Sequence, residues 1–480
     1  MRVPDARQIQ IERLRSDPLD VLVLGGGING AGVLRDLVLR SAAAGIPPAA
    51  GLIEQRQFAS GTSSRNSQLI HGGLRYLGNL EFGLVREALR ERAILLKIAP
   101  TLVEPLAFVM PFYSRFARLY YGAGLSLYDL LAGGRNISRH RILGRHKALA
   151  LEPALASEHL RAAAVFYDGR VQAARFVLAN LSDARANGGL AVNHVRAMGR
   201  RREWSGWCVE VVDELTGERF DIRARKLVET TGPWERKAPL RLVRGSHIIV
   251  PRLTSGPHAV AWFEDSGRIV FVIPWGEAGD LSLVGTTEVD HDGGPDDVRI
   301  SSAEVRYLLG MVRRLFPGAR GVEPIAAYSA LRPLLREEGA SATRTSREHR
   351  IWNAADGVLH VAGGKYTTYR LMSEEAADAV AREIAPRLAG LHVTAESPLP
   401  AQDVPGDVNG RIAFAVEKDL ARRLADLMFV STNWGYEQQW TQLRLEPYAR
   451  GMAALLGWNE LRIQEEIESV LCRTALPEHI

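Results

Sequence analysis

Three glycines near the amino terminus have the spacing of a dinucleotide-binding turn. Gly25, Gly27 and Gly30 follow the pattern G-x-G-x-x-G, and Glu54 lies farther along the chain. In this pattern the first glycine permits a sharp turn, the second lets a pyrophosphate approach the backbone, and the third allows close helix packing. A carboxylate at position 54 would accept hydrogen bonds from ribose hydroxyls. The chain contains no second G-x-G-x-x-G, so we expect one bound dinucleotide.

The residues around these glycines predict the elements that must position them. Residues 20–24 (DVLVL) form a short apolar run typical of a buried strand, and an apolar-periodic stretch follows the glycines to about residue 41. Residues 49–53 form the next apolar run, which ends at Glu54. The order strand, tight turn, helix, strand is the context that this fingerprint requires.

Later segments add a second glycine turn and a run of strands. Residues 358–362 predict a strand that leads through Gly363 and Gly364 into a helix ending near residue 384. Residues 258–289 alternate with β character and predict a mostly antiparallel sheet. A Pro/Gly-rich linker is expected at residues 399–410, followed by helices.

Composition limits the class of protein. The chain has 480 residues, of which 46% are apolar and 24% charged, as in folded globular proteins of more than one compact unit. Cys208 and Cys472 lie outside any metal-binding spacing, so no metal site is expected. The first twenty residues lack the apolar run of a signal peptide, and no run is long enough to span a membrane. We therefore expect a cytoplasmic protein, or one bound peripherally to the inner face of the cell membrane.

Arginine dominates the positive charge, and the net charge is +5. A coding preference for arginine would explain this excess, and so would an anionic partner. Nucleic acid is not expected, because no nucleic-acid-binding motif occurs. Residues 114–147 are rich in arginine around an aromatic and apolar stretch, with Asp129 the only acid. Such a segment suits an anionic lipid surface, or alternatively a solvated basic face over core residues.

Residues 62–77 (TSSRNSQLIHGGLRYL) are more specific than the glycine fingerprint. Together with the fingerprint, this stretch resembles the FAD-dependent sn-glycerol-3-phosphate dehydrogenases, which belong to the glycine-oxidase and D-amino-acid-oxidase-like flavoproteins. Further segments resemble the same family in the same order and extend the likeness over roughly residues 18–395: 231–234 (TGPW), 244–251 (RGSHIIVP), 273–275 (IPW), 285–290 (GTTEVD), 331–334 (LRPL) and 363–370 (GGKYTTYR).

The resemblance implies an α/β fold, with a Rossmann-like FAD-binding domain interleaved with a mostly antiparallel β substrate domain and a short C-terminal helical domain. We expect residues 18–110, 150–240 and 325–398 to form the discontinuous FAD-binding domain. The substrate domain is expected at residues 241–324, with parts of 111–149, and the helical domain at 411–480. This last domain is shorter than is usual in the family, and a homodimer is one option for the assembly.

The resemblance also implies the reaction and its residues. The expected reaction is oxidation of sn-glycerol 3-phosphate to dihydroxyacetone phosphate, with hydride transfer to N5 of FAD and electrons passed to a membrane quinone. A histidine is a natural proton acceptor, and guanidinium groups bind phosphate through paired hydrogen bonds. The expected catalytic and substrate-binding residues are His247 as base, Arg332 and Arg347 as phosphate clamp, Arg75 as a third cation, Lys365 beside the flavin and substrate oxygen, and Tyr76 as an orienting phenol or a packing residue.

Residues expected to bind the cofactor lie in the two glycine turns and in the stretch that carries the resemblance. They are Gly25, Gly26, Gly27, Ile28, Asn29, Gly30, Glu54, Thr62, Ser63, Ser67, Gln68, Leu69, Gly232, Gly364, Lys365, Thr367 and Thr368.

Three other functions remain open at this point. An oxidase of the same fold would pass electrons to oxygen and form hydrogen peroxide. A related FAD-dependent amine or amino-acid oxidase would not need several arginines for a phosphate dianion. A catalytically silent FAD-binding relative would not need to retain Arg75, His247, Arg332 and Lys365.

Overall fold

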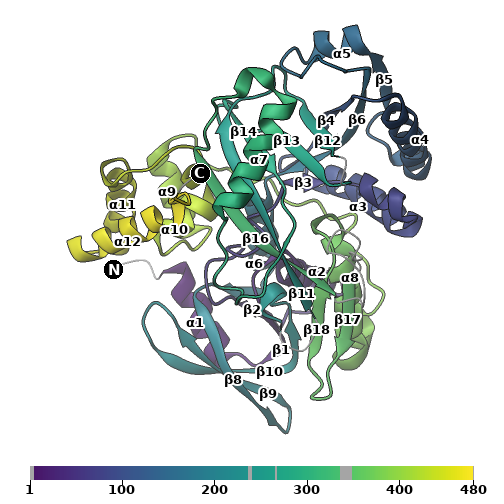
Figure 1. Cartoon of the computed structure of the whole chain (residues 1–480). Helices are drawn as coiled ribbons and strands as arrows, with labels where there is room; N and C mark the ends of the chain where they lie inside the picture. Colours follow the sequence, from purple (N-terminus) through teal and green to yellow (C-terminus); the bar gives the residue numbers. More distant parts are fainter. Residues whose placement is uncertain (1–4, 236–239, 265–266, 336–348, 479–480) are drawn as a thin grey trace.

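Two β-sheets organise the chain, and a cluster of helices follows them at the C-terminal end (Figure 1). The computed structural model describes residues 5–235, 240–264, 267–335 and 349–478. Among these residues, none of the helices combines the length and the apolar character needed to cross a bilayer.

The first sheet has the amino-terminal strand β1 (Leu19–Leu24) in its middle. β1 pairs in parallel with β2 and β10, while β2 continues to β7 and β10 to β18, also in parallel. Parallel strands are buried on both faces, which explains why β1 and β2 are apolar apart from the half-buried Asp20. The other strands are β2 (Ala50–Ile53), β7 (Leu190–Val192), β8 (Val195–Glu203), β9 (Gly206–Asp213), β10 (Arg219–Glu229), β17 (His349–Asn353) and β18 (Leu359–Gly363).

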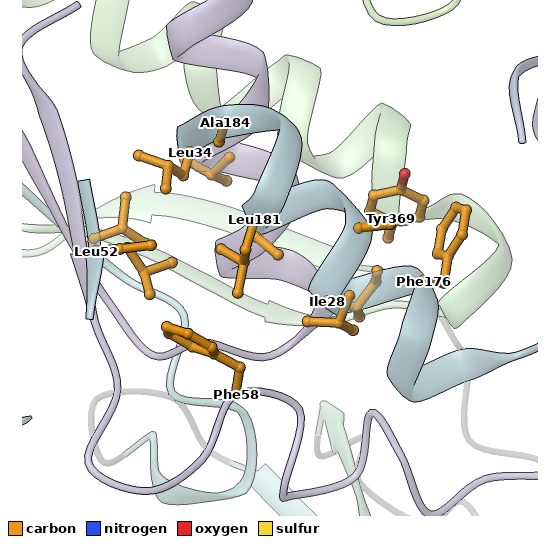
Figure 2. Close-up of a cluster of buried hydrophobic side chains, with 14 of the residues drawn as sticks. Ile28, Leu34, Leu52, Phe58, Phe176, Leu181, Ala184 and Tyr369 are labelled. Atoms are coloured by element: carbon orange, nitrogen blue, oxygen red, sulfur yellow. The ribbon is translucent and has the colours of Figure 1, made fainter. Parts of the chain in front are cut away.

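Three helices cover one face of this sheet: α2 (Ile28–Ala43), α6 (Ala173–Ala186) and α8 (Tyr369–Ile384). Figure 2 shows the core between them, where Leu34 of α2 lies near Leu181 of α6 above Leu52 of β2. Phe176 and Tyr369 meet edge to face, with 5.4 Å between their ring centroids. The other face is covered by α1 (Ala6–Ser16), which buries Ile11 and Leu14.

The second sheet is antiparallel except for the pairing of β4 with β12. Its strands come from separate parts of the chain. They are β3 (Leu69–Ile70), β4 (Val103–Phe112), β5 (Arg141–Gly144), β6 (Ala162–Val171), β11 (Leu240–Pro251), β12 (Ala259–Phe263), β13 (Ile269–Trp275), β14 (Leu281–Gly285), β15 (Val289–Asp290) and β16 (Ala326–Leu335). α7 (Ser302–Leu315) packs on one face through Val305, Leu308 and Val312.

Two further groups of helices lie on opposite sides of the view in Figure 1. The first comprises η1 (Leu74–Asn79), α3 (Phe82–Ile98), α4 (Arg115–Ala132), η2 (Gly133–Arg135) and α5 (Arg145–Leu151). The second, drawn in yellow, comprises α9 (Val408–Glu417), α10 (Leu424–Asp426), the π-helical turn η7 (Leu427–Ser431), η8 (Trp434–Tyr436), α11 (Gln442–Leu456) and α12 (Glu460–Thr474). Short 3₁₀ turns complete the elements: η3 (Gly232–Trp234), η4 (Pro317–Ala319), η5 (Tyr366–Thr368) and η6 (Pro386–Leu388).

The C-terminal helices are fixed to the first sheet by buried charges. Arg175 of α6 forms an ion pair with Asp419, and His194 Nε2 lies 2.8 Å from Asp426. Apolar residues of α9 to α12 also join the core beneath the second sheet. The C-terminal region therefore packs against both sheets.

The predicted fold class is confirmed, and sheet membership differs in detail from the predicted segments. β4, β6 and β16 lie within or overlap the segments assigned to the FAD-binding domain, yet they pair within the second sheet. Local sequence indicates that a segment is extended but not which sheet it joins, because pairing depends on distant partners. The domain limits themselves stay a prediction.

Candidate active site

A cavity of about 670 Å³ lies between the carboxyl ends of the parallel strands and the second sheet. This is the edge at which open α/β sheets bind ligands, and the volume is in the range of cofactor sites. Its walls come from both sheets and from the loop between β2 and β3. The predicted site residues that line it are Gly25, Gly27, Ile28, Asn29, Glu54, Thr62, Ser63, Ser67, Leu69, Tyr76, Gly232, Arg332, Gly364 and Lys365.

The glycine turn forms one end of the cavity. Gly25 has φ +109°, a conformation that favours glycine, and an added Cβ at Gly30 would lie 1.9 Å from the Gly25 carbonyl oxygen. Gly27 precedes the first turn of α2, where backbone N–H groups and the helix dipole favour a phosphate. This backbone cradle would be filled by larger residues, so it fits the pyrophosphate of FAD.

Glu54 is fixed by two backbone groups. Its carboxylate accepts hydrogen bonds from the N–H of Gly26 at 2.7 Å and from that of Arg56 at 2.9 Å. Burial raises the pKa of Glu54, while these two donors oppose the rise. The side chain lines the cavity beside the glycine turn, where a ribose would lie.

Several predicted cofactor residues are placed behind the cavity wall. Gln68 accepts a hydrogen bond from the N–H of Ala173 and donates one to the carbonyl of Ser64, so its amide joins two segments of the scaffold. The hydroxyl of Thr367 lies 3.2 Å from the backbone N and O of His71. Gly26, Gly30 and Thr368 likewise lie outside the lining. These residues shape the site, and direct contact with FAD stays a prediction.

Arg332 is held at the other end of the cavity. Its guanidinium donates to the Thr286 hydroxyl at 2.7 Å and to the Thr287 carbonyl at 3.1 Å. It lies over Gly245, where an added Cβ would come within 2.5 Å of it. The arginine is thus oriented by the second sheet while it still lines the cavity.

His247 lies one layer behind the cavity surface, with 2% of its surface exposed. Its Nε2 is 2.9 Å from the hydroxyl of Ser67, and Ser67 itself lines the cavity. Burial, with the charge of Arg332, lowers the pKa of His247 to about 3. The imidazole is therefore neutral near pH 7 and can accept a proton through Ser67.

Lys365 and Tyr76 meet on the cavity wall. The ammonium nitrogen of Lys365 lies 3.8 Å from the centroid of the Tyr76 ring, a cation–π geometry. The ring is buried, so it fixes where the charge lies. Arg347 lies outside the described residues, as does the side chain of Arg75, and their predicted roles stay predictions.

Sequence reasoning missed Asp168, which also lines the cavity. Its carboxylate accepts hydrogen bonds from the Tyr128 hydroxyl at 2.8 Å, from Arg92 at 2.6 Å and from the N–H of Gly72 at 3.2 Å. Asp168 therefore connects α3 and α4 to the backbone of the loop that carries His71. A single acid within the apolar run at residues 162–171 was the available sequence signal.

A buried cluster of charges lies beside the glycine-turn end. His360 Nδ1 is 2.8 Å from a Glu235 oxygen and 3.2 Å from a Glu229 oxygen. In the part of the chain that the structure describes, these three residues are the group whose spacing would suit a metal ion. Arg200 also pairs with Glu229 and with Asp356, so an ion-pair network accounts for the cluster.

Comparison with known proteins identifies the family. The sequence model described as DAO, FAD dependent oxidoreductase, matches residues 20–370. The chain belongs to this family. Aerobic glycerol-3-phosphate dehydrogenase of Escherichia coli K12 is 36% identical over 407 residues, which cover 81% of this chain and 78% of that protein. Glycerol-3-phosphate dehydrogenase of Synechocystis is 36% identical over 399 residues, covering 76% of this chain and 70% of that protein. The protein is thus one of the FAD-dependent glycerol-3-phosphate dehydrogenases.

Solved structures agree on the fold. Glycerol-3-phosphate dehydrogenase of Bacillus halodurans, solved with FAD, has a TM-score of 0.75 at 24% identity and covers 99% of this chain and 98% of its own. L-α-glycerophosphate oxidase of Mycoplasma pneumoniae, also with FAD bound, has a TM-score of 0.60 at 16% identity and covers 76% of this chain and 95% of its own. The FAD cofactor predicted for this flavoprotein is confirmed.

The contact between Gly30 and Gly25 yields a prediction about cofactor binding. Gly30→Ala places a methyl group against a backbone oxygen, so α2 must move away from the turn. Overpacking of this kind costs about 1 to 3 kcal/mol, and we expect FAD affinity to fall about tenfold or more. Flavin absorbance of the purified protein measures the loss. Gly310→Ala in α7, where an added Cβ has no neighbour within 4 Å, should retain full flavin. Equal flavin content in both variants would contradict this role for Gly30.

Proposed function

We propose that this dehydrogenase oxidises C2 of sn-glycerol 3-phosphate to give dihydroxyacetone phosphate, and that its electrons pass to a quinone. One observation carries the proposal: Arg332, Lys365 and Ser67, which is bonded to His247, line one cavity together with the glycine turn. A guanidinium, an ammonium group and a hydroxyl bonded to an imidazole therefore face one cavity, as this reaction would require. The names of the curated relatives support the same substrate.

Arg332 would bind the phosphate of the substrate. A planar guanidinium offers two parallel donors to phosphate oxygens, and the bonds to Thr286 and Thr287 fix the plane in advance. Fixed orientation reduces the conformational entropy that binding must remove. The predicted contribution of Arg347 would add a second guanidinium.

Ser67 and His247 would remove the hydroxyl proton of the substrate. When the hydride leaves C2, a ketone that still carried the proton would be a strong acid, so a base of low pKa suffices. His247 is suited to this because burial keeps it neutral. The proton would pass from the substrate oxygen to Ser67 Oγ, while the serine proton passes to His247 Nε2.

Lys365 would stabilise negative charge near the substrate oxygen. A cation held in a partly desolvated cavity acts more strongly than the same cation in water. The FAD cofactor supplies the hydride acceptor at N5. Glu54, the glycine turn and the hydroxyls of Thr62 and Ser63 would hold it, and the position of the substrate would follow from Arg332.

The test of this function is anaerobic reduction of the bound flavin by glycerol 3-phosphate. We expect bleaching by glycerol 3-phosphate but not by glycerol. Arg332→Ala should weaken substrate affinity about ten- to a hundredfold, since charge-assisted hydrogen bonds contribute about 1.5 to 3 kcal/mol. Arg332→Lys should recover only part of this. Arg241→Ala removes an arginine of the same sheet that pairs with Asp290 and should behave as the parent. If Arg332→Ala still distinguished glycerol 3-phosphate from glycerol as well as the parent does, Arg332 would not be the residue that binds the phosphate.

The low pKa of His247 predicts an unusual pH dependence. If His247 had the ordinary pKa of a histidine, it would become protonated and the enzyme would lose activity as the pH falls through about 6.5. With a pKa of about 3, His247 stays neutral there, so the rate of flavin reduction at saturating substrate should show no inflection near that value. His247→Ala should slow this rate by a factor on the order of a hundred to ten thousand. Stopped-flow absorbance measures both, and a rate near that of the parent would transfer the role to Lys365.

The outer face of α4 supports a membrane as the source of the quinone. Phe116, Leu119 and Leu130 are each about three-quarters exposed, and the neighbouring Arg115 and Arg118 are exposed as well. Apolar side chains flanked by arginines suit an anionic bilayer surface. A second, apolar groove of about 310 Å³ opens beside this face between α3 and α4.

The alternative acceptor is oxygen, and formation of hydrogen peroxide in air would identify the protein as an oxidase instead. A homodimer stays a prediction.

This face can be tested with lipid vesicles. Replacing Phe116, Leu119 and Leu130 with serine should lower pelleting with anionic vesicles at least tenfold, because each buried apolar side chain contributes about 1.5 to 3 kcal/mol. Binding of the parent should fall as salt screens the arginines. Activity with a soluble dye should not change. Serine at Leu443 and Leu461, which are exposed on α11 and α12, serves as control. Pelleting that the three serine substitutions leave unchanged, or no pelleting of the parent, would favour a solvated face.

A further inference from the structure

Tyr328 of β16 contacts both members of the pair formed by Ser67 and His247. Its ring lies against the imidazole, with 5.0 Å between centroids and 31° between planes. Its hydroxyl donates to the carbonyl of Asn66 at 2.7 Å, directly before Ser67 in the chain. One side chain thus fixes the ring of the base and the backbone of its hydrogen-bonding partner.

The orientation of His247 depends on this packing. Nε2 is bonded to Ser67, whereas Nδ1 is buried and has no hydrogen-bond partner among the residues that the structure describes. On the other side of the ring, an added Cβ at Gly285 would lie 2.1 Å from His247 Cδ2. A catalytic histidine is commonly oriented by a third polar group on its second nitrogen. Here the imidazole is instead held between Gly285 and the Tyr328 ring.

Tyr328 is in turn supported by the C-terminal region. The ring of Tyr436 in η8 lies 5.0 Å from that of Tyr328, and Phe429 in η7 lies 5.0 Å from Tyr436. Arg473 of α12 lies 4.7 Å from the Phe429 ring. An added Cβ at Gly435 would come within 2.3 Å of Phe429, so this segment is closely packed. Contacts of this kind continue without a gap from α12 to His247.

We propose that Tyr328 and Tyr436 are positioning residues for the proton-accepting pair, which makes the C-terminal helical region part of the catalytic apparatus. This inference rests on the proposed role of His247. Both tyrosines are nearly fully buried, Tyr328 with 5% and Tyr436 with 4% of the surface exposed, and neither lines the cavity. They act on the reaction through His247 and Ser67 rather than on the substrate.

The experiment compares three variants of the FAD-loaded full chain. Tyr436→Leu removes the ring that supports Tyr328, and Tyr436→Phe keeps it. Tyr448→Leu removes a ring of the same C-terminal core that packs on Trp434 and Trp440 instead. Flavin content establishes that each variant retains its cofactor. Stopped-flow reduction by glycerol 3-phosphate then separates the limiting rate from the Kd.

We expect Tyr436→Leu to lower the limiting rate on the order of ten- to a hundredfold, because small displacements of reacting groups have effects of this size. The Kd should change little, since Arg332 is held by separate contacts. Tyr436→Phe and Tyr448→Leu should react at the rate of the parent. A parental rate in Tyr436→Leu, or an equal loss in Tyr448→Leu, would overturn the inference.

A substrate-independent measurement separates this inference from the proposed function. In protein labelled with ¹⁵N-histidine, the His247 signal is identified by its absence in His247→Ala. Burial lowers the pKa of His247, so loss of the Tyr436 ring should admit water and raise the pKa toward 6.5. An unchanged titration would overturn the positioning role even if glycerol 3-phosphate failed to reduce the flavin. Failure of that reduction in the parent would refute the proposed function alone.

Discussion

One loop forms hydrogen bonds with elements of both sheets, and the geometry of the site depends on it. The loop between β2 and β3 begins at Glu54, which binds Gly26, and continues to Ser63, whose hydroxyl accepts from Ile28 at the start of α2. In the same loop, Thr62 donates to the carbonyl of Leu331 in β16, and the hydroxyl of Ser67 is hydrogen-bonded to His247 of β11. The same short segment therefore contacts the cofactor end and the substrate end. A shift of the second sheet would therefore be transmitted to α2 through this loop.

The cofactor end could be predicted from the sequence because its determinants are local. β1, the glycine turn, α2 and β2 follow one another, and their residue types reflect backbone conformations that few residues tolerate. Gly25 and Gly30 lie five residues apart and contact each other directly, so their spacing in the sequence is enough to predict the turn. The predicted strand at residues 49–53 and the observed β2 (Ala50–Ile53) differ by a single residue.

The substrate end could be predicted only in part, since it is assembled from distant segments. His247 was recognisable as a candidate base, but its place behind Ser67 depends on a side-chain contact between residues 180 positions apart in the chain. Asp168 and Tyr328 were missed for the same reason: an acid or a tyrosine in an apolar run gives no hint of its partner. The 3₁₀ and π-helical turns of the C-terminal region have no sequence period, so the contact of Tyr436 with Tyr328 was beyond local reasoning.

The hydrogen bond between Tyr128 and Asp168 places different demands on the two sides of α4. On the outside of the helix, Phe116, Leu119 and Leu130 are exposed, so other side chains at these positions would leave the packing of the protein unchanged. On the inside, position 128 needs a phenol of fixed length, because a shorter donor would leave the buried carboxylate with one bond fewer. Among related sequences, substitutions in α4 should therefore be concentrated on its exposed face. The exposed face of α4 can therefore change in sequence, whereas its buried contact through Tyr128 cannot.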